Sequence, residues 1–178
     1  MAGLFDHAKL RAGERVLVHG GSGAVGIFAV QLARRSHATV ITTASEGNRE
    51  FLRLLGADRV IDYHIERFEE HARDLDVVFD AVGGTTLQRS WNVLKTGGRM
   101  VTIAADSEGT KDDRIKEAFF IVQPDQQQLT EIARLIDQSD LRACLGAVVP
   151  LEQAPAAYSG AARMRPGPGK VVISMVEG

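Results

Sequence analysis

Cysteine is almost absent from this sequence. Cys144 is the only one, which excludes an internal disulfide and any zinc site built from four cysteines. Charge of one sign is not in excess, because the formal net charge is −2 and the lysines and arginines are scattered, so no nucleic-acid or membrane partner is expected. No apolar run reaches the 18 or so residues of a membrane span, and no signal-peptide core opens the chain. These absences predict a cytoplasmic protein.

The composition is otherwise that of a globular protein. The 178 residues are 44% hydrophobic and 25% charged, enough for one sizeable core and short of two full domains. The five histidines form no cluster. His19 ends an apolar run and is expected in the core, and Cys144 lacks a paired histidine motif and is expected to be structural.

A glycine-rich stretch organises the first half of the chain. Residues 15–18 are apolar and β-branched, which is typical of a buried strand, and residues 27–35 read as an apolar helix. The spacing Gly-x-Gly-x-x-Gly between a strand and a helix predicts a dinucleotide site. The glycines allow a tight turn, close approach of a pyrophosphate and close helix–strand packing, and the helix amides meet the phosphate charge. The residues of this predicted site are Gly20, Gly21, Ser22, Gly23, Ala24, Val25 and Gly26.

Strands and helices alternate along most of the chain, which predicts a parallel sheet covered on both faces. The expected strands are 15–18, 39–43, 59–62, 76–80, 99–103 and 118–122. Residues 65–73 are expected as a surface helix and 105–116 as a polar loop. A later helix is predicted to begin with an Asp125/Gln128 capping box and to bury a stripe of four side chains, Leu129, Ile132, Ala133 and Ile136. A last strand, 170–176, has no place in this sheet.

Five motifs in this order resemble the medium-chain dehydrogenase/reductase superfamily, and specifically its zinc-free quinone oxidoreductase-like branch. They are residues 16–26 (VLVHGGSGAVG), 55–58 (LGAD), 60–63 (VIDY), 76–84 (DVVFDAVGG) and 94–99 (LKTGGR). The resemblance implies an α/β fold: a Rossmann-type, doubly wound parallel six-stranded sheet of order 3-2-1-4-5-6. It also implies hydride transfer from NADPH to a small carbonyl, enone or quinone.

The resemblance further implies that a catalytic domain is missing. Residues 4–145 would form the cofactor-binding domain, and 146–178 a C-terminal segment that returns to the absent domain. The family's zinc ligands lie mainly in that absent part, so no metal is expected here, and this fragment alone is expected to be inactive. Relatives dimerise through this part of the domain, and strand 118–122 is expected to offer an open edge, so we expect a homodimer.

The residues near the second strand favour NADPH over NADH. In NAD-preferring sites, an acidic residue about 20 positions after the glycines accepts a hydrogen bond from the ribose 2′-hydroxyl. Counting from Gly23, that position is Thr43. Ser45 and Arg49 are expected to bind a 2′-phosphate by hydrogen bond and charge. The alternatives are that Ser45 only caps a helix, that Arg49 is solvated, and that Glu46 binds a 2′-hydroxyl.

Other candidate site residues follow from strand ends and from the resemblance. Val82, Gly83, Ile103 and Ala104 follow strands at their carboxyl ends, where ligands bind in such sheets. The resemblance places Tyr63 near the adenine, with an ordinary boundary tyrosine as the alternative. It also places Phe120 and Lys170 near the nicotinamide. No catalytic acid is identified.

A different class of function stays open. It is a non-catalytic dinucleotide-binding or redox-sensing module. A short-chain dehydrogenase is rejected, because neither Tyr63 nor Tyr158 is followed by lysine in the Tyr-x-x-x-Lys spacing.

Overall fold

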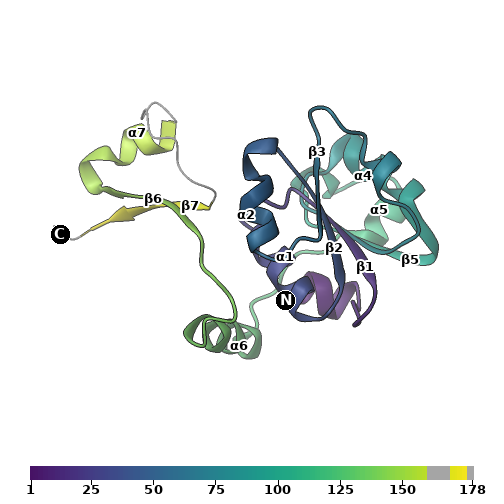
Figure 1. Ribbon diagram of the computed structural model, residues 1–178, viewed down its shortest axis with the longest axis horizontal. Coiled ribbons are helices and arrows are strands. Elements are labelled where there is room, and N and C mark those ends of the chain that lie inside the picture. The colour runs from purple at the N-terminus through teal and green to yellow at the C-terminus, as the bar shows by residue number, and fades with distance from the viewer. Residues whose placement is uncertain (160–168, 176–178) are drawn as a thin grey trace.

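The structure is a computed structural model that describes residues 1–159 and 169–175. Its main sheet has five parallel strands in the order β3-β2-β1-β4-β5 (Figure 1). The strands are β1 Arg15–His19, β2 Thr39–Ala44, β3 Arg59–Asp62, β4 Leu75–Asp80 and β5 Leu94–Thr102. All six residues of β4 are buried, as expected of a central strand covered on both faces.

Helices cover both faces of this sheet, which confirms the predicted doubly wound arrangement. The α-helices are α1 Gly26–Arg35, α2 Arg49–Leu54, α3 Phe68–His71, α4 Gly84–Ser90, α5 Asp113–Ala118, α6 Gln126–Asp137 and α7 Ala154–Ser159. Single turns of other helix types are η1 Gly3–His7, η2 Glu46–Asn48, η3 Trp91–Val93, η4 Ala105–Ser107 and η5 Leu151–Gln153.

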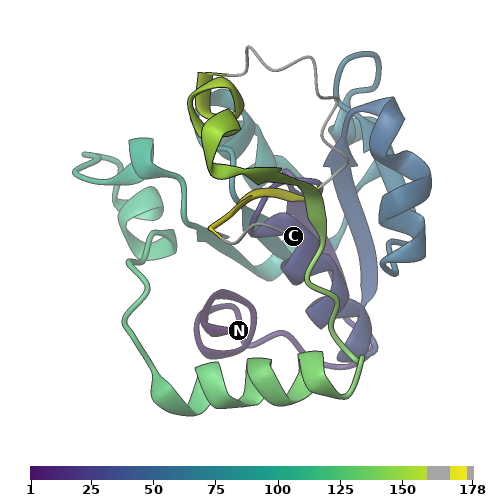
Figure 2. The same cartoon turned by 90° about the vertical axis from the view of Figure 1, so that its left-hand side faces the viewer.

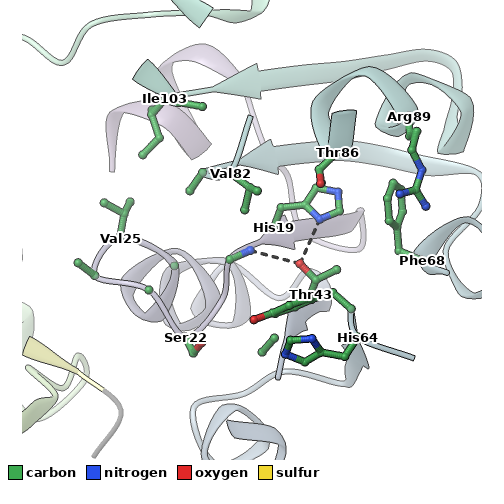
Figure 3. Close-up of a pocket in the computed structure, with 18 of the residues that line it drawn as sticks. His19, Ser22, Val25, Thr43, His64, Phe68, Val82, Thr86, Arg89 and Ile103 are labelled. Carbon is green, nitrogen blue, oxygen red and sulfur yellow. Dashed lines mark hydrogen bonds between the residues drawn. The ribbon is translucent and has the colours of Figure 1, made fainter. Parts of the chain in front are cut away.

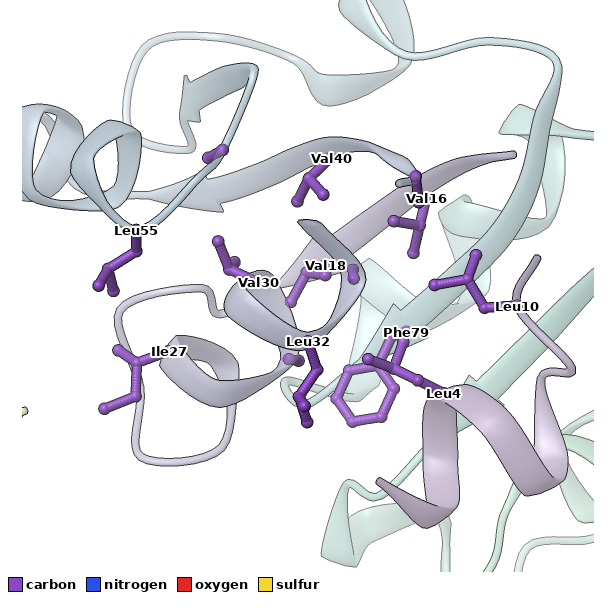
Figure 4. Close-up of a cluster of buried hydrophobic side chains, with 14 of the residues drawn as sticks. Leu4, Leu10, Val16, Val18, Ile27, Val30, Leu32, Val40, Leu55 and Phe79 are labelled. Atoms are coloured by element: carbon purple, nitrogen blue, oxygen red, sulfur yellow. The ribbon is translucent and has the colours of Figure 1, made fainter. Parts of the chain in front are cut away.

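Two hydrophobic clusters form the core, one on each face. Val16 and Val18 of β1 belong to a cluster with residues of η1 and α1 (Figure 4) and of α2 and α6, whereas Leu17 between them belongs to a cluster with residues of α3, α4 and α5. This alternation follows from the two-residue period of a strand. The core therefore holds the carboxyl ends of the strands in a fixed register.

The first turn of α1 packs directly on the turn that follows β1. A Cβ on Gly26 would overlap the carbonyl oxygen of Gly20 and lie 2.7 Å from the Cα of Gly21. A Cβ on Gly21 would overlap the hydroxyl of Thr42. The close packing expected of the glycine motif is therefore present in the structure.

The predicted sixth strand, 118–122, is wrong. Ala118 is instead the last residue of α5, which begins in the stretch 105–116 that was expected to be a loop. The reason is a cap: the Asp112 carboxylate accepts a hydrogen bond from the Arg114 amide, 3.0 Å away, and starts a helix. Only one isolated parallel bridge, between Thr102 and Phe119, remains of the expected pairing. The sheet order is 3-2-1-4-5.

Several element boundaries also differ from prediction. The helix expected over 65–73 is only α3, and β5 begins at Leu94 instead of 99, with Gly97 and Gly98 inside the strand. Asp125 caps α6 by accepting from the amides of Gln127 and Gln128, as predicted. The Gln128 side chain does not complete the capping box, because it donates to Asp6 of η1, which lies beside α6 (Figure 2).

The predicted apolar stripe of α6 is also wrong in detail. Of the four predicted side chains, Ile132 packs against the core, whereas Leu129 is 63% exposed; the side chain that the helix buries fully is Leu135, at 2% exposure. The helix meets the core only along one edge, so periodicity alone does not identify the buried position.

The C-terminal segment forms a second, smaller sheet. β6 Leu145–Pro150 pairs in parallel with β7 Lys170–Ser174, and neither strand joins the main sheet, as expected for the last strand (Figure 1). Several of its apolar side chains are exposed, namely Leu145, Val148, Val171, Val172 and Ile173. A two-stranded sheet with an exposed apolar face is marginal in water.

We predict that Gly26→Ala destabilises the protein, because the new methyl group meets backbone that has no room to move. The free energy of unfolding should fall by about 3 kcal/mol, the upper end for overpacking. The melting temperature should fall by roughly 10 °C. Gly47→Ala is the matched control, since a Cβ there meets nothing within 4 Å. Equal melting temperatures for the two variants in thermal unfolding would contradict the role of this contact.

Candidate functional site

A cavity of about 1250 Å³ lies at the carboxyl ends of the strands (Figure 3). Its walls come from the β1–α1 turn, the end of β2, the β3–α3 loop, and the segments that follow β4 and β5. In open parallel sheets this is the edge at which ligands bind, where the strand order reverses between β1 and β4.

The β1–α1 turn presents free backbone amides to this cavity. Gly20 has a φ of +73°, and its carbonyl accepts a hydrogen bond from the Gly23 amide at 2.9 Å. α1 has neither a side-chain cap nor an acidic residue in its first turn. Within the described part of the chain, the amides of Ala24 and Val25 have no hydrogen-bond partner. Unpaired amides at the positive end of a ten-residue helix are suited to receive an anion.

Most of the predicted site residues lie together in the wall of this cavity. Those that line it are Gly20, Ser22, Gly23, Ala24, Val25, Gly26, Thr43, Tyr63, Val82, Ile103 and Ala104. Gly21 lies just behind the turn, where its amide donates to the Thr43 carbonyl at 3.0 Å. Gly83 also lies behind the wall, with its amide 3.0 Å from the carboxylate of Asp80.

Ser45 and Arg49 lie outside this wall. The Arg49 guanidinium donates to both oxygens of Glu46, at 2.9 and 2.7 Å, and to the Val60 carbonyl at 2.6 Å. It also reaches Glu66 at 3.3 Å, and the hydrogen bonds to Glu46 first, and then to Glu66, raise the pKa of Arg49. The Ser45 hydroxyl accepts from Asn48 at 2.9 Å, so both side chains are engaged locally.

Phe120 and Lys170 are placed elsewhere. Phe120 lines a second, apolar cavity of about 250 Å³ between η1, α1 and α6, which shares Val25 and Ile103 with the first. Lys170 begins β7 in the separate small sheet. The structure therefore does not bring Lys170 to the predicted cofactor site.

Thr43 lines the cavity, but its hydroxyl faces a buried histidine. The hydroxyl oxygen lies 3.1 Å from Nδ1 of His19 and accepts from the Gly20 amide at 3.3 Å (Figure 3). His19 is fully buried, as predicted, and its Nε2 lies 2.8 Å from the hydroxyl of Ser90 on α4. Burial, followed by the charge of Arg89, lowers the pKa of His19 to about 4, so the ring is neutral at pH 7.

Two carboxylates hold the segments after β4 and β5. Asp80 accepts from the amides of Val82 and Gly83 and from the hydroxyl of Thr102, the last at 2.7 Å. Burial first, and then the charge of Asp106, raises the pKa of Asp80. Asp106 lines the cavity and accepts from the Gly84 amide at 2.8 Å. The sequence reasoning missed Asp106, although its place just after a strand end was a usable signal.

Two cations of the cavity wall, Arg67 and Arg89, were also not identified by the sequence analysis. Arg89 is held by two hydrogen bonds of 2.6 Å to Glu69 and lies over the ring of Phe68. Arg67 lies 3.9 Å from the same carboxylate, and its side chain is 71% exposed. Because Arg89 already neutralises Glu69, Arg67 is the cation of this wall with the weakest charge compensation. No sequence signal marked it, since it is a single charge in a loop.

Neither a metal centre nor a membrane span is present in the ranges 1–159 and 169–175. In those ranges, His, Cys, Asp and Glu side chains nowhere gather in a group of three that could hold a metal ion. No helix within them is long and apolar enough to cross a bilayer.

Comparison with known proteins agrees with this geometry. The family described as zinc-binding dehydrogenase matches residues 55–173. The chain belongs to this family, within the medium-chain dehydrogenase/reductase superfamily. It is 31% identical over 175 residues to a probable mitochondrial zinc-binding oxidoreductase of Arthroderma benhamiae, covering 92% of this chain and 53% of that protein. It is 29% identical to the mitochondrial NAD(P)H oxidoreductase RTN4IP1 of Danio rerio, covering 93% of this chain and 50% of that protein.

A solved structure shows the same fold. The quinone oxidoreductase from Coxiella burnetii superposes with a TM-score of 0.85 at 31% identity, covering 98% of this chain and 57% of that one. The chain thus spans about half the length of these three relatives. The predicted superfamily is confirmed, and the three relatives named here are oxidoreductases by name.

The buried, neutral His19 predicts a specific loss of stability in acid. The unfolded chain takes up a proton near the ordinary pKa of 6.5, but the folded protein does so only near 4. The stability that His19 contributes is therefore present above pH 6.5 and is lost as the pH falls toward 4, by about 3 kcal/mol in the free energy of unfolding.

Urea unfolding at pH 7 and pH 4.5 measures this effect. His19→Gln should remove most of the His19 contribution from the difference between the two pH values. His64→Gln, at an exposed side chain, is the matched control and should leave the difference as in wild type. An unchanged difference in His19→Gln would contradict the assignment.

Proposed function

We propose that this chain is the cofactor-binding part of an NADPH-dependent oxidoreductase that transfers hydride to a small carbonyl, enone or quinone. One observation carries the proposal. The uncapped start of α1 opens, through the glycine turn, on a cavity large enough for a dinucleotide. The relatives named oxidoreductase, quinone oxidoreductase and NAD(P)H oxidoreductase support the reaction class.

The chain's own residues would bind and orient the cofactor. NADPH supplies the hydride when it is bound. The amides of Ala24 and Val25 would receive the diphosphate, and Tyr63 would lie beside the adenine. Val82 and Ile103, from neighbouring strand ends, would flank the nicotinamide. Asp80 fixes the segment that carries Val82 by accepting from two of its amides.

We assign the 2′-phosphate to Arg67. The position expected to carry an acidic residue is Thr43, and the nearby Glu46 is paired with Arg49, so no free carboxylate opposes the phosphate there. Arg49 is itself occupied by two carboxylates, whereas Arg67 lines the cavity as an exposed cation. A guanidinium with spare donors suits a phosphate better than one already paired.

The small sheet supports a division into two parts, 4–145 and 146–178. Its exposed apolar residues lie away from the main core, and relatives are about twice as long as this chain. We propose that β6 and β7 pack against the remainder of the full-length protein, which would also bring Lys170 toward the site. The homodimer stays a prediction, and the open edge strand 118–122 that was expected to support it is not present in the sheet. The cytoplasmic location also stays a prediction, since two relatives are named mitochondrial.

Nucleotide titration tests the cofactor assignment. By calorimetry, Arg67→Ala should weaken NADPH binding about 10- to 100-fold, the value of one hydrogen bond to a charged group, and leave NADH unchanged. Arg49→Ala should keep the wild-type preference, because that side chain does not line the cavity. Arg53→Ala, at an exposed position of α2, is the control. Equal effects of Arg67→Ala and Arg53→Ala would contradict the assignment.

Turnover is expected to require more than this chain. We predict that residues 1–178 bind NADPH but reduce no quinone or enone, because they span only about half the length of the oxidoreductases named above. The measurement is NADPH oxidation at 340 nm with quinone and enone substrates, with the full-length protein as the positive control. Reduction by residues 1–178 alone would overturn this division of labour.

A further inference from the structure

A chain of hydrogen bonds runs beneath the cavity from α4 to the glycine turn. The Ser90 hydroxyl donates to the Thr86 carbonyl at 2.7 Å, since a carbonyl only accepts. Ser90 therefore faces Nε2 of His19, 2.8 Å away, as an acceptor, and Nε2 must carry the proton. Nδ1 is then an acceptor, so the Thr43 hydroxyl donates to it at 3.1 Å.

The chain ends on the backbone of the glycine turn. With its proton directed at His19, the Thr43 oxygen is left to accept from the Gly20 amide at 3.3 Å. Gly20 in turn accepts from the Gly23 amide at 2.9 Å, and the free amides of Ala24 and Val25 follow. Donor and acceptor are therefore assigned for every hydrogen bond from Ser90 to Gly20. The Thr86 carbonyl of α4 fixes the direction at one end, and the Gly20 amide fixes it at the other.

The surroundings of His19 favour one state of the ring. The ring is fully buried and lies edge-on to Phe68, with centroids 4.7 Å apart. The charged groups that act on it are Arg89 and Glu69, which pair with each other at 2.6 Å. Because this ion pair is internally compensated, a neutral imidazole with a single tautomer is the stable occupant.

We propose that His19 is a positioning residue, which acts through the Thr43 hydroxyl to hold the Gly20 amide and so shapes the turn that binds the diphosphate. This inference rests on the proposed function, because it assigns the turn to a dinucleotide. The proposal gives Thr43 a role different from ribose recognition. Its hydroxyl contacts His19 and Gly20 beneath the cavity, and so it positions the turn and does not bind the ligand itself.

Thr43→Val tests the proposal because it keeps the shape of the side chain and removes the hydroxyl. By calorimetry, this variant should bind ADP and NADPH about tenfold more weakly, the value of one hydrogen bond. Thr43→Ser keeps the hydroxyl and should restore binding. Thr39→Val, at an exposed position of the same strand, is the matched control and should bind as wild type.

A phosphate-free probe separates positioning from simple destabilisation. Adenosine lacks the diphosphate, so its affinity, measured by NMR titration, should be the same in wild type and Thr43→Val. A general loss of structure would weaken adenosine and ADP binding alike, and that result would overturn the proposal.

The ¹⁵N spectrum of the His19 ring supplies a second, independent reading. It should show one protonated Nε2 and one bare Nδ1, unchanged between pH 5.5 and 8, and a proton on Nδ1 would overturn the proposal. Full ADP binding by Thr43→Val, with wild-type binding intact, would overturn the inference alone. Failure of wild-type protein to bind ADP, NADPH or NADH would overturn the proposed function and the inference with it.

Discussion

The contact between Gly26 and the backbone of Gly20 and Gly21 is the constraint on which the site depends. Because no side chain separates them, the first turn of α1 lies directly on the end of β1. This proximity brings the positive end of the helix to the edge where the strands end. A larger residue would move the helix away, and its free amides would then open on solvent instead of the cavity.

Polar groups buried beneath the cavity stabilise its two walls in different ways. On the β1–β2 side, the neutral ring of His19 is hydrogen-bonded to Ser90 of α4 and to Thr43, whose hydroxyl accepts from the glycine turn. On the β4–β5 side, Asp80 gathers donors from Val82, Gly83 and Thr102. Buried polar groups are costly unless they are hydrogen-bonded, and both of these are. These hydrogen bonds therefore fix the backbone segments that form the two walls of the cavity.

The two parts of the chain differ in how they are stabilised. The main sheet is buried on both faces and carries both hydrophobic clusters. The β6–β7 pair exposes Val148, Val171 and Ile173 and adds little to either cluster. An exposed apolar surface of this kind is typical of a segment that packs against another protein surface.

The sequence by itself determined the α/β class, the five strands of the main sheet and the glycine turn, because these depend on local patterns: apolar β-branched runs, glycine spacing and strand–helix alternation. It determined the superfamily through the resemblance of five ordered motifs. Only the tertiary structure decided that 118–122 is not a strand of the sheet, because strand pairing joins residues distant in sequence, and here it is limited to the Thr102–Phe119 bridge. It also decided that Arg49 is neutralised and Arg67 is exposed to the cavity, because the pairing of a charge depends on residues distant in sequence. For the same reason, the link from Ser90 through His19 to Thr43 is decided by the fold, which joins three elements far apart in the chain.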